Sequence, residues 1–276
     1  MKNIPTYFAK LGPMPLLLLA LLAATPGDAK AANLTVGIQT WTLRELNFDE
    51  TVEFAVKHNV KHLQMIAKHI DPMGPMAETR RKKAILDEKG LVCYTFGVAG
   101  TSLVHEENRK LFEFAKYMGI KLIIVEPGDF KIFDSLDTLA KEYDIKVGIH
   151  NHGIKSLYGN PLVVRNILKH RDSRIGVCLD AGWVTAAGFD AAKVFKEYEG
   201  RVFDIHLKDK VIKKTEGDDV SFDAQIGEGK ANLKGLFSEL QKSNWNGILA
   251  IETDSQDFAR KPADFVTTAV RFVKEN

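Results

Sequence analysis

The sequence predicts an α/β protein, a closed (β/α)8 barrel in which eight parallel strands alternate with helices. The chain has 276 residues, and barrels of this kind have roughly 250 residues in a single domain. Short apolar runs alternate with longer helical segments, which is typical of parallel pairing. Hydrophobic residues make up 45% of the chain, enough for a full core. The first strand is not followed by a glycine-rich dinucleotide loop, so an open nucleotide-binding sheet is disfavoured.

The first 31 residues are typical of an export signal and are excluded from the barrel. Lys2 and Lys10 give a positively charged start, and an apolar run from Pro15 to Ala24 follows. This run is too short to cross a bilayer as a stable helix. Ala29-Lys30-Ala31 has the small residues of a cleavage site. We therefore expect one barrel domain over residues 32–276, exported, in the periplasm, and not attached to a membrane after cleavage.

The first half of the chain contains four strand–helix units. Each strand is a short apolar run, and Gly90 and Gly119 mark two helix ends because glycine readily adopts the left-handed conformation found there. The expected strands are Leu34–Thr42, Val60–Ile66, Leu91–Phe96 and Ile120–Val125. The expected helices are Asp49–His58, with Asp49 as its cap, Ala77–Lys89, Glu106–Met118 and Phe130–Tyr143.

The second half repeats the pattern, with one long insertion. Asn160 and Pro161 form a helix start, because asparagine caps the first turn and proline suits its first position. A polar loop is expected over Asp209–Ala231. The expected strands are Lys146–Asn151, Arg174–Leu179, Arg201–Leu207 and Gly247–Thr253. The expected helices are Pro161–His170, Asp190–Tyr198, Asn232–Lys242 and Phe258–Lys274.

Charge and cysteine content limit the classes of partner. The formal net charge is +2 and both signs are spread along the chain, which argues against nucleic acid as a partner. Cys93 and Cys178 lie in apolar runs and are interpreted as buried thiols. The histidines His58, His69, His105 and His170 are interpreted as surface residues. The sequence leaves open whether the chain forms a homo-oligomer.

Five of the expected strands end in a residue that can bind a metal. Because the carboxyl ends of barrel strands meet at one rim, these five side chains are expected to surround one space. They are Glu126, His150, Asp180, His206 and Glu252. Mixed carboxylate and imidazole ligands suit Mn²⁺, Zn²⁺, Co²⁺ or Fe²⁺, with Mg²⁺ also considered. The sequence therefore predicts a site for one divalent cation.

The order of these units and six short phrases resemble the xylose-isomerase-like TIM barrel superfamily of sugar and sugar-phosphate isomerases and epimerases. The resemblance covers nearly all of the chain after the signal. The phrases begin at Val125, His150, Leu179, His206, Gly227 and Ile251. The same superfamily includes a repair-nuclease branch with several zinc ions. Phe96, Glu126 and Trp183 stand where that branch has histidines, so nuclease activity is disfavoured.

The resemblance implies that one cation is held by residues after strands five to eight, here His150, Asp180, His206 and Glu252. His150 is a departure, because the epimerases have glutamate at that position. Two interpretations remain open: Glu126 supplies the missing carboxylate, or His150 or His152 moves the proton. Histidine suits proton transfer because its ordinary pKa is about 6.5.

Further residues are assigned by the direction of their side chains. Strand alternation places His152 on the face of His150, and Lys208 on the face of His206. The candidate catalytic residues are His152, His150, Glu252 and Lys208. Candidate sugar-binding residues are Gln39, Trp41, Gln64, Trp183 and Glu228, the last within a glycine-flanked loop.

The leading functional prediction is a divalent-metal-dependent sugar isomerase or epimerase acting on a small carbohydrate. It would remove a proton next to a carbonyl through a metal-stabilised enediolate. An alternative is a 3-oxo-glycoside lyase or hydratase that works by β-elimination on an exported carbohydrate. A second alternative is a sugar-binding barrel that has lost catalysis, favoured by Trp183 and His150 and opposed by the retained Asp180, His206 and Glu252.

Overall fold

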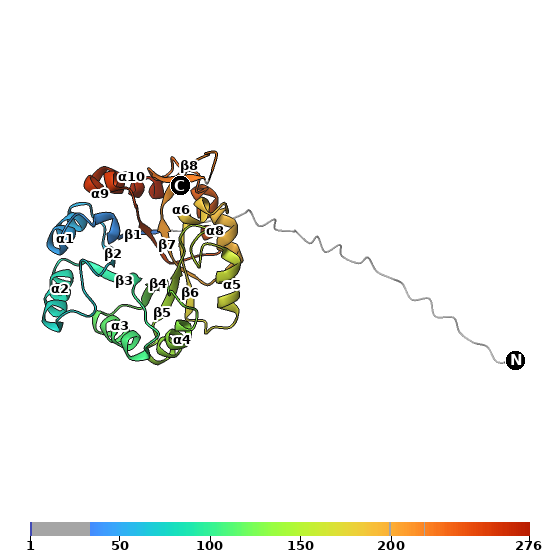
Figure 1. The fold of residues 1–276 in the computed structure, drawn as a ribbon. Coiled ribbons are helices and arrows are strands. Elements are labelled where there is room, and N and C mark those ends of the chain that lie inside the picture. The colour runs from blue at the N-terminus through green and yellow to red at the C-terminus, as the bar shows by residue number, and fades with distance from the viewer. Residues whose placement is uncertain (2–33, 199, 218) are drawn as a thin grey trace. The chain divides into compact units, whose positions relative to one another are not determined.

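The computed structural model describes Met1 and residues 34–198, 200–217 and 219–276. The expected signal peptide, residues 1–31, lies outside these apart from Met1. Within the described residues, eight parallel strands close into a barrel (Figure 1). They are β1 (Thr35–Gln39), β2 (His62–Met65), β3 (Val92–Ala99), β4 (Leu122–Val125), β5 (Lys146–His150), β6 (Ile175–Asp180), β7 (Val202–Leu207) and β10 (Ile248–Ile251). The predicted (β/α)8 fold is confirmed.

The strand order around the barrel follows the chain, since β1 pairs with both β2 and β10. The helices form a ring outside the strands (Figure 1). Those of the first half are α1 (Phe48–Lys57), α2 (Met76–Glu88), α3 (His105–Met118) and α4 (Ile132–Tyr143). Those of the second half are α5 (Pro161–Lys169), α6 (Ala181–Ala186), α7 (Ala191–Glu197), α8 (Leu233–Lys242), α9 (Gln256–Arg260) and α10 (Pro262–Glu275).

Most helix ends follow the expected signals. Asn160 caps α5 by accepting a hydrogen bond from the backbone of Leu162, and Pro161 occupies the first turn. Gly119 ends α3 with φ of 79°. The cap of α1 differs from the expectation: Asn47, not Asp49, caps this helix, and Glu50 completes a reciprocal capping box. Asn47 precedes the first turn and so can reach its unpaired N–H groups.

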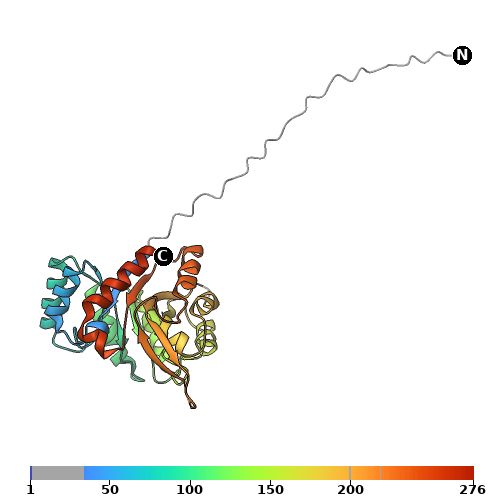
Figure 2. The ribbon, with the colours of Figure 1, turned by 90° about the horizontal axis from the view of Figure 1, so that it is seen from above.

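Three segments differ from the sequence prediction. The expected polar loop over Asp209–Ala231 contains an antiparallel hairpin, β8 (Asp209–Lys213) and β9 (Val220–Ala224), which extends beyond the barrel (Figure 2). The first strand stops at Gln39, and a 3-10 helix, η1 (Thr40–Leu43), contains Trp41. The expected last helix is two helices, because Pro262 cannot continue the backbone hydrogen bonding of α9.

The core lies between the barrel strands and the helix ring, and the described residues from 34 onward form one compact unit. Cys93 and Cys178 are buried free thiols, as predicted. Among the described residues, none of the helices combines the length and apolar character that a membrane crossing needs.

Candidate metal centre and active site

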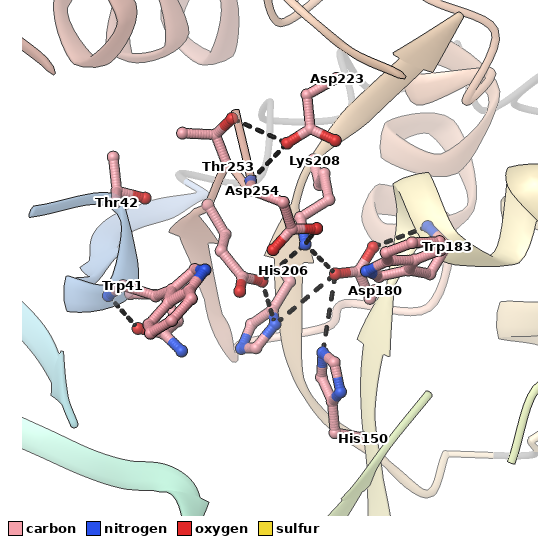
Figure 3. Close-up of polar contacts among 12 residues, drawn as sticks. Trp41, Thr42, His150, Asp180, Trp183, His206, Lys208, Asp223, Thr253 and Asp254 are labelled. Carbon is pink, nitrogen blue, oxygen red and sulfur yellow. Dashed lines mark hydrogen bonds and ion pairs between the residues drawn. The ribbon is translucent and has the colours of Figure 1, made fainter. Parts of the chain in front are cut away.

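Four of the five predicted metal ligands come together at the carboxyl ends of adjacent strands. They are His150 of β5, Asp180 of β6, His206 of β7 and Glu252 immediately after β10. One ligand atom from each lies within 4.8 Å of the corresponding atom of every other. All four residues are buried. We call this group the four-residue cluster, and Figure 3 shows the side chains of His150, Asp180 and His206 converging.

The register of two strands and the start of a helix place Asp180. In the ladder between β6 and β7, Asp180 lies opposite His206. Its Oδ1 caps α6 by accepting a hydrogen bond of 2.8 Å from the backbone of Trp183, so that Oδ2 faces the cluster. The Asn151 side chain brackets the Asp180 backbone: its Oδ1 accepts from the amide at 3.0 Å, and its Nδ2 donates to the carbonyl at 3.3 Å. One carboxylate thus both starts a helix and supplies a cluster oxygen.

The two ring nitrogens of His206 have different partners. Nε2 lies 3.0 Å from Oε1 of Gln64. The Gln64 amide is oriented by its other end, because Nε2 donates to the carbonyl of Gly97 at 3.1 Å. An amide oxygen can only accept, so His206 has a proton on Nε2. Its Nδ1 is then the nitrogen directed at the cluster, 2.5 Å from Glu252 and 3.8 Å from Asp180.

Lys208 is buried, with only 1% of its side chain exposed, and its ammonium group lies among three carboxylates. Its Nζ lies 3.0 Å from Asp180, 3.4 Å from Glu252 and 2.8 Å from Asp254. Burial alone would raise the pKa of Asp180, but Lys208 and the two neighbouring histidines hold it well below its usual range. Burial acts in the same direction on Glu252, yet His206 and Lys208 lower its pKa to about 2. Both carboxylates are therefore anionic near neutral pH.

The four-residue cluster fits a divalent cation. Among the described residues, five buried atoms form ion pairs but make no hydrogen bond of suitable geometry: Nδ1 and Nε2 of His150, Oδ2 of Asp180, Nδ1 of His206 and Oε2 of Glu252. Buried polar atoms without hydrogen bonds cost free energy. A cation bound by all four side chains would remove that cost, and two imidazoles with two carboxylates are ligands that Mn²⁺, Zn²⁺, Co²⁺ and Fe²⁺ accept.

Glu126 lies beside the four-residue cluster and not within it. Its Oε2 is 2.5 Å from Nδ1 of His152 and 3.8 Å from Nδ1 of His150. Burial raises the pKa of Glu126, but His150 and His152 lower it to about 2. The same ion pair raises the pKa of His152 against the opposing effect of burial. In this geometry His150 belongs to the cluster, and Glu126 is hydrogen-bonded to His152 beside it.

A cavity of about 370 Å³ opens next to the cluster. Its polar side is formed by His150, His152, Glu252 and Asp254, and its apolar side includes Trp41. The side chain of His152 is 42% exposed, so this histidine is accessible from the cavity. Lys208 and Trp183 do not line this cavity among the described residues. Lys208 thus acts on the cluster's carboxylates from the protein side.

The predicted sugar-binding residues occupy three kinds of position. Trp41 and Gln39 line the cavity, whereas the ring of Trp183 packs edge-on against His152 with centroids 5.5 Å apart. Both glutamines already have partners in the protein: Gln39 accepts from the Trp41 backbone at 2.6 Å and donates to Gly97 at 3.3 Å. Gln64 bridges Gly97 and His206. These contacts suit positioning of the site more than recognition of hydroxyl groups.

Glu228 does not join the site. It is exposed, and its loop instead wraps the carboxylate of Asp209. Oδ2 of Asp209 accepts from the amides of Gly227 and Gly229 at 3.0 and 2.8 Å, and Oδ1 accepts from Ala231 at 3.0 Å. A side chain at position 229 would meet Asp209 at 2.1 Å. Glycine is therefore required here by close packing.

Sequence reasoning missed two residues at the site. Asp254 lines the cavity and bonds Lys208, and its position two residues after Glu252 was the signal that could have found it. Asn151 faces away from His150 on the strand, and the neighbouring sequence carries no signal that its side chain bonds the backbone of Asp180. The prediction for His69 was wrong, because this histidine is buried and not on the surface. Its Nε2 lies 3.1 Å from the Leu46 carbonyl, a contact that depends on the fold.

The chain is similar to proteins with known sequences and structures. It is 25% identical over 240 residues to an inosose dehydratase of Clostridium perfringens, covering 72% of this chain and 80% of that protein. An uncharacterised protein from Parabacteroides distasonis has a structure with a TM-score of 0.68 at 26% identity, covering 88% and 98% of the two chains. The IolI protein, solved with a bound zinc atom, has a TM-score of 0.66 at 15% identity and shares the fold, covering 86% and 96%.

The family comparison agrees with the barrel fold. The matched model spans residues 33–275, which is nearly the whole chain after the expected signal. The chain belongs to the xylose isomerase-like TIM barrel family.

Proposed function

We propose that this protein is a divalent-metal-dependent lyase that works by β-elimination on an oxidised carbohydrate, either a keto-cyclitol or a 3-oxo-glycoside. The protein is a carbohydrate-modifying enzyme of the isomerase, epimerase or related lyase type. The sequence alone favours isomerisation or epimerisation. The relatives named inosose dehydratase favour elimination, because a dehydratase expels water from its substrate.

The observation that best supports removal of a proton next to a ketone, the first step of the elimination, is the pair formed by His152 and Glu126. Glu126 holds Nδ1 of His152 at 2.5 Å, so Nε2 is the ring nitrogen available to a substrate. Because His152 lines the cavity beside the cluster, it is placed to remove a proton from the carbon next to a ketone. A carboxylate behind a histidine fixes its tautomer and stabilises its protonated form.

The four-residue cluster would hold the cation through one atom each of His150, Asp180, His206 and Glu252. When bound, the cation would supply electrophilic polarisation of the ketone oxygen, which acidifies the neighbouring C–H bond. His152 removes that proton, and the bond from the β-carbon to its oxygen substituent breaks. The departing oxygen then takes the proton back from His152. The products are an unsaturated ketone and water or an alcohol.

The test is a substrate screen of the metal-loaded enzyme with inososes and 3-oxo-glycosides, following the ultraviolet absorbance of the enone. We expect His152→Gln to lower the rate by at least about a hundredfold, as for loss of a general base. His170→Gln, at an exposed histidine in the C-cap of α5, is the matched control and should leave the rate unchanged.

Deuterium from D₂O distinguishes the related reactions. Recovered substrate that contains deuterium and is accompanied by its epimer, with no enone, would overturn the lyase proposal in favour of an epimerase. Full activity in enzyme that contains no divalent metal by mass spectrometry would overturn the metal requirement.

A further inference from the structure

The cavity beside the cluster has two chemically different sides. The side next to the metal ligands is polar. The remaining lining residues come from the ends of β1, β2 and β3: Trp41, Ile66, Ala67 and Val98 form an apolar wall, and Gln39 and Lys68 are next to them in the lining. Trp41 is 43% exposed and Val98 is 39% exposed, so both present apolar surface to a ligand. The cavity volume of about 370 Å³ is within the range of sites for ligands of drug size.

Trp41 is exposed, yet its backbone and its ring both have partners in the protein. Its backbone N–H donates to Gln39 at 2.6 Å, and its carbonyl accepts from the Arg44 guanidinium at 2.9 Å. The same guanidinium lies over the indole ring, 5.0 Å from its centroid, and also bonds the carbonyls of Thr253 and Asp254 beyond β10. One ring face is thus covered by Arg44. Figure 3 shows Trp41 and Trp183 on opposite sides of the cluster.

The polar side chains at the edge of this wall already have partners. The Gln39 amide bonds Trp41 and Gly97 through its two ends, and Nζ of Lys68 donates to the carbonyl of Arg44. A second sugar ring placed here would bring hydroxyl groups against apolar side chains and engaged polar atoms. An apolar group would instead release water from the indole and the aliphatic side chains.

We propose that the substrate is a glycoside with an apolar aglycone, and that the wall formed by Trp41, Ile66, Ala67 and Val98 binds this aglycone. This inference rests on the proposed function, since the oxidised sugar ring would occupy the polar side. The sugar arrives with a ketone at carbon 3. His152 takes the proton from carbon 2, the bond from carbon 1 to the aglycone oxygen breaks, and that oxygen takes up the proton. The products are a 1,2-unsaturated 3-oxo sugar and the free apolar alcohol, with no change in overall oxidation state.

The experiment compares methyl and cyclohexylmethyl 3-oxo-β-glucosides, whose leaving alcohols have similar acidity, so that the preference reports binding. For the wild-type holoenzyme we expect kcat/KM to favour the cyclohexylmethyl compound by about tenfold or more, from the added apolar contact. Trp41→Ala should abolish this preference, so that the kcat/KM values of the two compounds become equal within about twofold. Trp41→Phe should retain part of the preference. Tyr117→Ala, at an exposed aromatic residue of α3, should retain all of it.

Binding of the unoxidised cyclohexylmethyl and methyl β-glucosides by calorimetry separates this inference from the proposed reaction. Tighter binding of the cyclohexylmethyl compound, lost in Trp41→Ala, supports the aglycone wall even if no 3-oxo-glycoside is cleaved. The absence of cleavage would contradict only the lyase proposal. Cleavage without any aglycone preference, or a preference that persists in Trp41→Ala, would overturn the aglycone wall and leave the lyase proposal intact.

Discussion

At the scale of single residues, the hydrogen bonds of His206 decide which of its nitrogens can bind a cation. Gly97 orients the amide of Gln64, and Gln64 in turn holds the proton on Nε2 of His206. Partners of this kind fix the tautomer and direction of metal-binding histidines, and their loss commonly weakens metal affinity by about 10 to 100-fold. Gln64 is therefore a positioning residue in this site.

The first prediction concerns metal affinity. Gln64→Leu should weaken divalent-cation binding by about 10 to 100-fold, because His206 loses the acceptor that fixes its tautomer. Gln64→Glu keeps an acceptor and should retain most of the affinity. The measurement is calorimetric titration of the metal-free protein with Zn²⁺ or Mn²⁺.

Gln39→Leu is the control, since it removes a bond to the same Gly97 carbonyl without a contact to His206. Equal metal affinity in Gln64→Leu and wild type would show that the bond to His206 has no positioning role.

His69 gives a prediction for the pH dependence of stability. Burial is the main cause that lowers the pKa of His69 from 6.5 to about 4. The folded state then binds fewer protons than the unfolded state below pH 6.5, so stability is lost as pH falls from about 6.5 to about 4. Between pH 7 and pH 5 this residue should remove about 2 kcal/mol from the free energy of unfolding.

Denaturant unfolding at pH 7 and pH 5 measures this loss. His69→Gln keeps a donor for the Leu46 carbonyl but cannot titrate. The decrease in its free energy of unfolding between pH 7 and pH 5 should therefore be smaller than in the wild type by about 2 kcal/mol. His170→Gln, at an exposed position, should behave as wild type. An unchanged loss in His69→Gln would mean that other groups account for the acid sensitivity.

At the scale of elements, short α6 connects the barrel to the cluster. Asp180 starts this helix, and Gly182 in its first turn packs on the aliphatic part of Lys208. A Cβ at position 182 would lie 2.7 Å from Cγ of Lys208, which is near the root of that side chain and cannot easily move. The helix therefore determines where the Lys208 ammonium lies among the carboxylates.

Gly182→Ala should lower the free energy of unfolding by about 1 to 3 kcal/mol, the usual range for overpacking. It should also reduce activity, because Lys208 is displaced from Asp180 and Glu252. Chemical denaturation and the elimination assay measure the two effects. Gly100→Ala is the control, since its added Cβ meets no atom within 4 Å. Wild-type stability in Gly182→Ala would show that Lys208 has room to shift.

The hairpin of β8 and β9 depends on Asp209. Four backbone amides donate to this carboxylate: those of Lys210, Gly227, Gly229 and Ala231. Asp209→Ala should destabilise the protein by several kcal/mol, at about 1 to 3 kcal/mol for each buried donor left without a partner. Asp209→Asn retains one acceptor oxygen and should therefore lose less stability than Asp209→Ala. Thermal unfolding measures both, and equal melting temperatures for the two variants would contradict this account.

At the scale of the whole molecule, we propose that residues 1–31 are removed on export to the periplasm. The expected cleavage follows Ala31, so the mature protein should begin at Ala32. The measurement is the intact mass of protein recovered from the periplasmic fraction of a Gram-negative host. Protein that retains Met1 in the cytoplasm would contradict this proposal. Ala31→Asp provides the control, since an acidic residue there should block cleavage.

The whole barrel could be predicted because its signals are local. Each strand is a short apolar run, each helix has start and stop residues nearby, and parallel pairing places all strand ends at one rim. The cluster of His150, Asp180, His206 and Glu252 follows from that topology. The hairpin was missed because its strands carry polar residues and are stabilised by Asp209 through contacts up to 22 residues away.

The sequence by itself determined the fold class, the family and the four side chains of the cluster. Only the tertiary structure decided that Glu126 is hydrogen-bonded to His152, that Gln64 orients His206 across 142 residues, and that, among the described residues, Trp41 lines the cavity beside the cluster while Trp183 does not. The physical reason is the range of the interactions. Strand and helix preferences act between near neighbours in the chain, whereas hydrogen-bond partners and cavity walls depend on which distant residues the closed barrel brings together.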